Sequence, residues 1–294
     1  MSGRARLRRA WLGLVTVLGL SRRGFFIPYR YAHRLPGPGD RSGYPAIDAL
    51  FAQCRDGFRE CVEGLAPLAA DLAAIGRDPP PAPRWDQDWF PRLDAAMAYG
   101  LVRRHRPRRI VEVGSGHSTR FLARAVADAG MSCQITAIDP APRADLARLP
   151  VELVGQAVPA VGAAPFLVLQ PGDFLMIDSS HILMPGSDAD FLLGQVLPGL
   201  PGGVFVHIHD IFLPEDYPPH WDWRGYNEQL GVMQLLLGGG WEVVFASRYV
   251  VTRMDELLNR PPLRDLPLRP GAYESSLWLR KRSDAADPPP ATHA

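Results

Sequence analysis

Two short polar runs in this sequence have the composition of a metal or acid–base site. The first runs from Asp178 to His181, the second is His209 and Asp210, and each follows an apolar stretch typical of a buried strand. Two carboxylates and an imidazole suit a divalent cation with coordination positions left for water or substrate. We therefore predict a metal at Asp178, His209 and Asp210. Taken singly, each residue fits equally well as a turn cap or a backbone hydrogen-bond partner.

A glycine turn with a downstream acid indicates a nucleoside site. Gly114 and Gly116 follow the apolar segment 109–113, and Asp139 ends the next apolar segment. Glycine lets the backbone pass close to a ligand, and the N-terminus of the following helix offers free N–H groups. Asp139 is placed to accept hydrogen bonds from ribose hydroxyls. A dinucleotide site would favour a third glycine where this sequence has Thr119.

The elements that must position these residues alternate between strands and helices, which predicts a mostly parallel sheet covered on both faces. The expected strands are 109–113, 134–138, 151–154, 174–178, 203–209, 242–248 and 276–281, and the expected helices are 92–105, 118–129, 143–148, 188–197 and 227–237. Ligands bind such sheets beyond the carboxyl ends of the strands. Strands 174–178 and 203–209 are expected to be neighbours, so their polar ends should converge.

A long loop follows the strand that ends at His209. Trp221 and Trp223 lie in it, and loops of this length over a strand end are usually functional. We expect either a lid whose tryptophans contact an aromatic or glycosyl acceptor, or solvent-facing packing. His207 is expected to be a core histidine, with support of a metal ligand as the alternative.

The segment before residue 106 is expected to add helices to the sheet. Residues 1–34 hold eight arginines and no acidic residue, so the N-terminus forms a basic arm. From Ile47 to Ile75 apolar residues recur at steps of three and four, which predicts an amphipathic helix interrupted near Pro67. The expected organisation is a basic arm at 1–43, a helical segment at 44–105, a catalytic domain at 106–282 and a disordered tail at 283–294.

The basic arm imitates a signal peptide but lacks a small-residue cleavage site. Its apolar run, residues 11–20, is shorter than the roughly 20 residues that span a bilayer. We expect a helix packed on the protein or frayed in solvent, with peripheral membrane contact or a transit sequence as alternatives. Three cysteines form neither an even disulfide framework nor a CxxC motif. This usage suits a reducing compartment, so the expected location is the cytoplasm.

The glycine turn resembles motif I of class I methyltransferases, and Asp139 matches the motif II acid of that family. The resemblance covers roughly residues 106–282. It implies a Rossmann-like, doubly wound seven-stranded sheet that is mostly parallel with an antiparallel last strand, preceded here by the N-terminal helical extension. It also implies S-adenosylmethionine as cofactor. The residues expected around its methionine and sulfonium end are Glu112, Gly114, Ser115, Gly116 and Ser118, with Asp139 at the ribose.

The polar runs resemble those of metal-dependent O-methyltransferases of the catechol and macrocin-type sugar groups. Their local sequence also resembles that of a bacterial family of largely unassigned methyltransferases. The catechol group has Asp-Asn where this chain has His209-Asp210, and a lysine base where it has His181. The only lysine in the chain is Lys281. An imidazole can take a hydroxyl proton, so we predict His181 as general base beside Asp178, assisted by Mg²⁺ or a similar ion.

These observations predict O-methylation of a small natural-product, sugar or aromatic hydroxyl. Rival interpretations are a metal-independent N- or carboxylate methyltransferase, a metal enzyme that does not methylate, and a non-catalytic methyltransferase-like binding module. No basic stripe interleaved with aromatic residues is present in the core sequence, so nucleic acid is not an expected partner. The expected partner is a small-molecule acceptor, and a homo-oligomer is left open.

Overall fold

The computed structural model describes residues 3–143 and 145–283 and contains two compact units, Met1–Arg41 and Ser42–Ala294. The first unit holds helix α1 (Gly3–Val17) and the short 3-10 helix η1 (Ala32–Arg34). The apolar side chains of Leu7, Trp11 and Leu14 on α1 are exposed. No helix among the described residues is both long and apolar enough to cross a bilayer. Membrane attachment of the arm stays a prediction.

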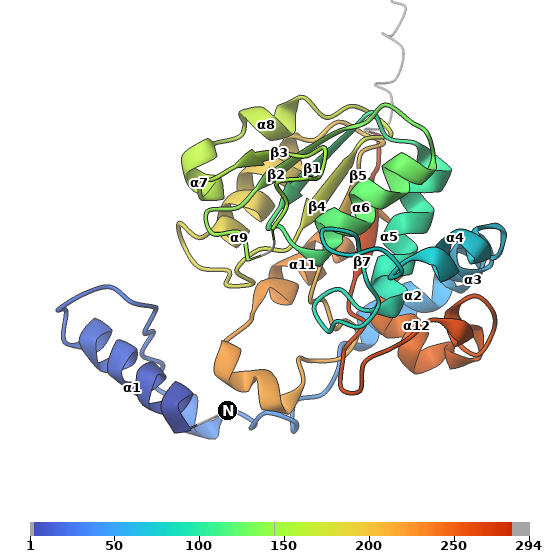
Figure 1. Ribbon diagram of the computed structural model, residues 1–294. Coiled ribbons are helices and arrows are strands. Elements are labelled where there is room, and N and C mark those ends of the chain that lie inside the picture. The colour runs from blue at the N-terminus through green and yellow to red at the C-terminus, as the bar shows by residue number, and fades with distance from the viewer. Residues whose placement is uncertain (1–2, 144, 284–294) are drawn as a thin grey trace, which may run out of the picture. The chain divides into compact units, whose positions relative to one another are not determined.

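The second unit is built on one seven-stranded sheet with the order β3-β2-β1-β4-β5-β7-β6 (Figure 1). Its strands are β1 (Arg109–Val113), β2 (Gln134–Ile138), β3 (Glu152–Val154), β4 (Phe174–Ile177), β5 (Phe205–Ile208), β6 (Trp241–Ala246) and β7 (Leu277–Lys281). β1 to β5 pair in parallel, and β7 runs antiparallel to both β5 and β6. This order confirms the predicted Rossmann-like sheet with an antiparallel last strand.

The centre of the sheet is apolar on both faces, as expected for parallel strands covered by helices. Every residue of β4 and of β5 is buried. In the register of these strands, Ile177 lies opposite Ile208. The next residues along the two strands, Asp178 and His209, therefore leave the sheet side by side at its carboxyl edge.

Helices on both sides of the sheet complete the core. They are α2 (Pro45–Gln53), α3 (Arg55–Glu63), η2 (Ala66–Leu68), α4 (Ala69–Ala74), α5 (Arg92–His105), α6 (His117–Asp128), α7 (Val158–Val161), α8 (Ala164–Leu167), α9 (Asp188–Phe191), η3 (Leu192–Val196), α10 (Leu197–Gly199), η4 (Pro219–Arg224), α11 (Glu228–Leu237), α12 (Ser247–Arg253), η5 (Asp255–Leu257) and η6 (Leu263–Asp265). α5 packs along α6 and also contacts α3, which explains why residues 93–102 of α5 are all buried (Figure 1).

Some predicted elements differ from the structure. The described residues of the expected helix 143–148 form a turn, in which the Asp145 carboxylate accepts the Ala147 N–H at 3.0 Å. Such a side-chain bond satisfies the backbone without a helix. The expected helix 188–197 is three short pieces with a π-helical centre ahead of Pro198, which has no N–H to donate to the helix. The amphipathic helix from Ile47 is divided at Cys54 as well as near Pro67. The predicted disordered tail, beyond Ser283, lies outside the described residues.

Candidate active site

The turn after β1 requires glycine at position 114. Gly114 has φ +78°, a left-handed conformation that glycine adopts without penalty. A Cβ atom there would press into the backbone carbonyl oxygen of Asp178, well inside van der Waals contact. The glycine turn of β1 and the end of β4 are therefore packed backbone to backbone, so the two predicted motifs form one site.

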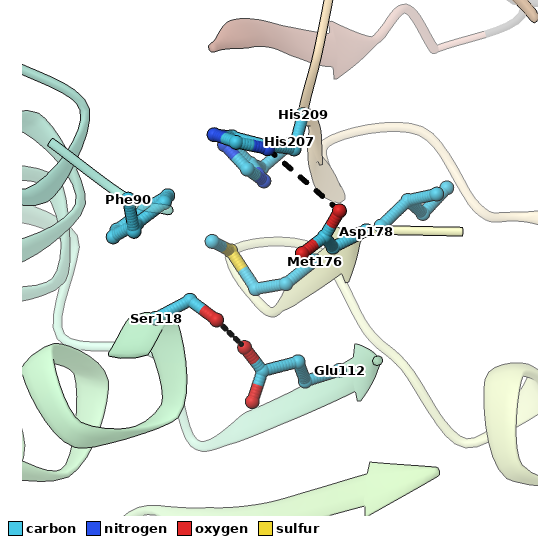
Figure 2. Close-up of a pocket in the computed structure, with 8 residues that line it drawn as sticks. Phe90, Glu112, Ser118, Met176, Asp178, His207 and His209 are labelled. Carbon is cyan, nitrogen blue, oxygen red and sulfur yellow. Dashed lines mark hydrogen bonds and ion pairs between the residues drawn. The ribbon is translucent and has the colours of Figure 1, made fainter. Parts of the chain in front are cut away.

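A hydrogen bond between Glu112 and Ser118 joins the two sides of this turn. The Glu112 carboxylate is 1% exposed and accepts hydrogen bonds from the hydroxyls of Ser118 at 2.5 Å and Thr119 at 2.6 Å. Burial raises the pKa of Glu112 to about 7, although these two hydrogen bonds act in the opposite direction. Figure 2 shows the Glu112–Ser118 bond. Both residues line a small cavity of about 10 Å³. That volume is about enough for one water molecule.

Asp139 lines a much larger cleft, about 1180 Å³ in volume. One carboxylate oxygen accepts the N–H of Ser115 at 2.9 Å and its hydroxyl at 2.7 Å, and the other accepts the Ala141 N–H at 2.8 Å. A carboxylate has about four acceptor positions, so room remains for a ligand hydroxyl. On this side the cleft is lined by Trp89, Val113, Gly114, Ser115, Ile138, Asp139, Pro140, Ala141 and Arg143.

The six predicted cofactor residues thus divide into two groups. Gly114, Ser115 and Asp139 line the cleft. Glu112 and Ser118 line the small cavity beneath it. Gly116 lines neither, and its N–H donates to the Thr119 hydroxyl at 2.9 Å. Three of the six residues therefore face the cleft, and the other three hold the turn in shape. Their contacts with a cofactor remain predictions.

The second predicted cluster lines the same cleft, to which Asp178, His181, His209 and Asp210 all contribute. The His181 Nε2 atom lies 3.2 Å from Asp178 Oδ1 and 3.6 Å from Asp210 Oδ2. The His209 Nδ1 atom lies 3.7 Å from Asp178 Oδ1 and 3.6 Å from Asp210 Oδ1. Figure 2 shows the contact between His209 and Asp178.

The backbone is strained at two of these positions. His181 has φ 60° and Asp210 has φ 53°, which are left-handed conformations that residues other than glycine rarely adopt. Such conformations cost roughly 1 to 3 kcal/mol and concentrate at functional sites, where the surrounding structure holds them. Here the two strained residues bring their side chains within 3.6 Å of each other.

A buried carboxylate that the sequence did not single out holds His181. Glu228, in the first turn of α11, is fully buried and lies 2.9 Å from His181 Nδ1. Its other oxygen accepts the Ser179 hydroxyl at 2.9 Å, and its backbone N–H donates to the His181 carbonyl at 3.2 Å. The Nδ1 atom is therefore occupied, which leaves Nε2 of His181 toward Asp178 and the cleft.

The carboxylates around these histidines favour positive charge on the imidazoles. Burial alone would lower the pKa of His181, but Asp178 and Glu228 raise it well above its usual value. Burial is likewise outweighed at His209, where Asp210, Asp178 and Asp94 raise the pKa. The Asp178 side chain is 47% exposed to the cleft. Although its surroundings oppose ionisation, the two imidazoles hold the pKa of Asp178 well below its usual range.

A second overlooked carboxylate, Asp94, supports His209. Asp94 lies in the first turn of α5, is fully buried and accepts the backbone N–H groups of Ser275 at 2.9 Å and Ser276 at 3.0 Å. It lies 3.5 Å from His209 Nε2. His207 is buried as expected for a core histidine: its Nε2 atom pairs with the Ser276 hydroxyl at 2.8 Å, and burial lowers its pKa to about 3.

Asp94 and Glu228 carry no motif that could have marked them. Each is an acidic residue in the first turn of an expected helix, where it is explained by the helix dipole alone. The aromatic run before α5 divides as well: Trp85 and Phe90 pack against Phe121, whereas Trp89 is 55% exposed and lines the cleft.

The predicted metal ligands are adjacent, and their chemistry suits a divalent cation. In the described part of the chain, however, no group of three His, Cys, Asp or Glu side chains is arranged to hold a metal ion. Atoms bound to one small octahedral cation lie roughly 3 Å apart. The His209 Nδ1 atom is 3.6 Å from Asp210 and 3.7 Å from Asp178, so the residues fit in type and need a small inward movement.

The long loop after β5 forms the outer wall of the cleft. It includes η4, and its residues Trp221, Trp223, Arg224 and Tyr226 line the cleft. The Tyr226 ring lies 4.5 Å from the His181 ring, centroid to centroid. The expectation of tryptophans over the strand end thus agrees with their position, while the acceptor they would contact remains a prediction.

Comparison with known proteins relates part of the chain to methyltransferases. Residues 111–211 match the family model described as a methyltransferase domain. No curated protein sequence matches the chain. The solved structure of the SAH-bound methyltransferase PaMTH1 from Podospora anserina is similar at 16% identity and a TM-score of 0.43, over 88% of this chain and 100% of that one. An O-methyltransferase from Bacillus cereus in complex with SAH is similar at 14% identity and a TM-score of 0.38, over 76% of this chain and 91% of that one.

The matched segment runs from β1 to the residue after Asp210. It therefore contains the glycine turn, Asp139, Asp178, His181 and His209. Residues 111–211 are thus similar to a methyltransferase domain, and the observed sheet is the Rossmann-like one that the resemblance implied.

Proposed function

We propose that this methyltransferase transfers the methyl group of S-adenosylmethionine to a hydroxyl oxygen of a small molecule. The observation that carries the proposal is the His181 imidazole, whose Nδ1 atom is held by the buried Glu228 and whose Nε2 atom faces the cleft-lining Asp178. A positioned imidazole of this kind serves a hydroxyl acceptor, which must lose a proton as it attacks. The cofactor side of the cleft begins at Gly114, which is packed against Asp178.

In the proposed reaction the acceptor oxygen attacks the methyl carbon, and the carbon–sulfur bond breaks with its electron pair passing to sulfur. The hydroxyl proton passes to Nε2 of His181, so the products are a methyl ether and S-adenosylhomocysteine. Glu228 keeps the imidazole oriented and stabilises the imidazolium that forms, as a buried carboxylate does in other histidine bases. The sulfonium charge of the bound donor disfavours a second positive charge nearby, which lowers the proton affinity of His181 before the reaction.

Two contributions to the rate follow from the cleft. Donor and acceptor are held together in one cleft, which removes most of the entropic cost of their encounter. In this proposal the loop residues Trp221 and Tyr226, which line the cleft, restrict the acceptor to the side of His181. Little covalent chemistry is required of the protein beyond this placement and the proton transfer.

We further propose that Asp178, His209 and Asp210 hold a divalent cation in the working enzyme. When bound, such an ion would acidify the acceptor hydroxyl. The proposal is supported by the adjacency of two carboxylates and an imidazole. Titration of the protein with Mn²⁺ by calorimetry should show one site that Asp178→Asn removes and His181→Ala retains. Equal binding by the Asp178→Asn variant would contradict these ligands, and methyl transfer unaffected by EDTA would show that catalysis does not need the ion.

The test of the main proposal is transfer of a ¹³C-labelled methyl group from the donor to a panel of hydroxylated sugars and phenols. The carbon chemical shift of the product separates an ether from an N-methyl amine or a methyl ester. We expect an ether, and a loss of rate by roughly 10² to 10⁴ in His181→Ala. Asp173→Asn is the control, because Asp173 is a buried carboxylate that accepts the Arg108 and Arg109 N–H groups at the opposite end of β1. A labelled amine, or full activity without His181, would overturn the proposal.

A further inference from the structure

An arginine in the outer wall of the cleft is held flat by aromatic rings. The guanidinium carbon of Arg224 lies 4.1 Å from the ring centroid of Trp221, 5.2 Å from that of Tyr226 and 5.4 Å from that of Trp223. Stacking of this kind occupies the faces of the guanidinium plane and leaves its N–H groups, which lie in the plane, for a ligand. Arg224 is therefore oriented before any ligand binds.

The charge of Arg224 has no counter-ion. No carboxylate of the described residues lies within 4.0 Å of its guanidinium nitrogens, whereas Arg248 in the same aromatic cluster pairs with Glu215 at 3.4 Å. The Nη1 group of Arg224 donates to the Tyr226 hydroxyl at 2.8 Å, and its buried Nε group has no acceptor. Unused donors on a cation that lines a cleft favour an anionic ligand.

Five carboxylates line the cleft with Arg224, and none of them lies within 4.0 Å of its guanidinium nitrogens; they are Asp88, Asp139, Asp178, Asp188 and Asp210. Asp188 accepts the backbone N–H of Ser180 at 2.8 Å, and Asp178 and Asp210 lie beside the two histidines. The loop side of the cleft consequently presents a positive group to whatever enters it.

Arg224 and the proposed base contact the same side chain. Tyr226 bonds to Arg224 through its hydroxyl, and its ring lies 4.5 Å from the His181 ring. A ligand lying along Tyr226 can therefore place a hydroxyl group at His181 and an anionic group at Arg224.

We propose that Arg224 binds a carboxylate or phosphate carried by the acceptor, so that the substrate is a ring compound with both a hydroxyl and an anionic group. This inference rests on the proposed methyl transfer for its biological meaning. The tryptophans would stack on an aromatic ring or on the apolar face of a sugar, and both sources share the same anion chemistry. Arg224 acts in this proposal as a specificity-determining residue.

Matched ligand pairs that differ in charge alone test the proposal by calorimetry, with and without bound S-adenosylhomocysteine. The first pair is 3,4-dihydroxybenzoate and 3,4-dihydroxybenzamide, and the second is glucose 1-phosphate and methyl glucoside. We expect the anionic member of at least one pair to bind roughly 10- to 100-fold more tightly, the effect of a charged hydrogen-bonded contact. The pair that shows the preference distinguishes an aromatic carboxylate from a glycosyl phosphate.

Arg224→Gln should abolish this preference, and Arg224→Lys should restore part of it. Arg248→Gln is the matched control, because Arg248 lies in the same cluster but is paired with Glu215, and it should keep the preference. Equal binding of both members of each pair, failure of all four to bind at millimolar concentration, or a preference retained in Arg224→Gln would overturn the proposal. Failure of S-adenosylhomocysteine to bind would instead count against the methyl-transfer proposal, and the charge preference is measured in either case.

Discussion

Replacement of Asp139 by alanine should weaken S-adenosylhomocysteine binding while leaving the protein folded. Three of the roughly four acceptor positions of this carboxylate are used by Ser115 and Ala141, and the remaining one faces the cleft. Its removal takes away the acceptor for a ribose hydroxyl and frees the Ser115 N–H. Loss of such a charge-assisted bond costs about 1 to 3 kcal/mol, which is roughly 5- to 150-fold in Kd.

The assay is calorimetric titration of purified variants, with thermal unfolding as the check on the fold. Asp145→Ala is the matched control, because the Asp145 carboxylate accepts the N–H two residues ahead at 3.0 Å, as Asp139 does at 2.8 Å, yet it does not line the cleft. Asp139→Asn separates the binding of a ribose hydroxyl from the support of Ser115. Its amide oxygen can still accept a bond, whereas its NH₂ group opposes the Ser115 N–H. Unchanged Kd in Asp139→Ala, or equal weakening in Asp145→Ala, would refute the assignment of the ribose position.

Three further predictions concern the turn and the base. Burial raises the pKa of Glu112 to about 7, so the contribution of this group to the stability of the fold is fully present below about pH 4.5. This contribution, on the order of 3 kcal/mol, is lost as the pH rises through 7. The Tm of Glu112→Gln should therefore depend less on pH than that of the unchanged protein, and the same dependence in both would contradict the raised pKa. Gly114→Ala should lower the free energy of unfolding by at least roughly 1 to 2 kcal/mol, the cost of a left-handed residue, and should therefore lower Tm. Gly116→Ala meets no atom within 4 Å and should be tolerated, and equal effects of the two substitutions would contradict the close packing of the turn. Glu228→Gln should reduce kcat by at least about tenfold without changing the Kd of S-adenosylhomocysteine, and an equal loss in the remote Asp173→Asn variant would reduce Glu228 to a structural role.

The sequence determines the centre of the fold more clearly than its periphery. β1 and β2 begin and end at the residues that the sequence predicted. The described residues of the expected helix 143–148 form a turn instead, in which a side-chain bond to Asp145 takes the place of a helical one. Local side-chain bonds of this kind are invisible to a periodicity argument.

The site shows the same division. Asp178, His181 and His209 could be placed together because the carboxyl ends of neighbouring parallel strands meet at one edge. Glu228 and Asp94 could not, because each reaches the site from a helix whose packing angle no local pattern specifies. The free charge of Arg224 is equally hidden, since only the folded chain shows which arginines have found a carboxylate.

A crystal structure of the protein with bound S-adenosylhomocysteine tests the central claim most directly. We predict that the ribose hydroxyls lie within hydrogen-bond distance of Asp139, that the homocysteine portion follows the backbone of Gly114 and Ser115, and that the sulfur atom faces the side of the cleft that holds His181 and Asp178. The account is contradicted if the ligand lies elsewhere, or if its sulfur atom points away from His181, because no acceptor placed beside that imidazole could then receive the methyl group.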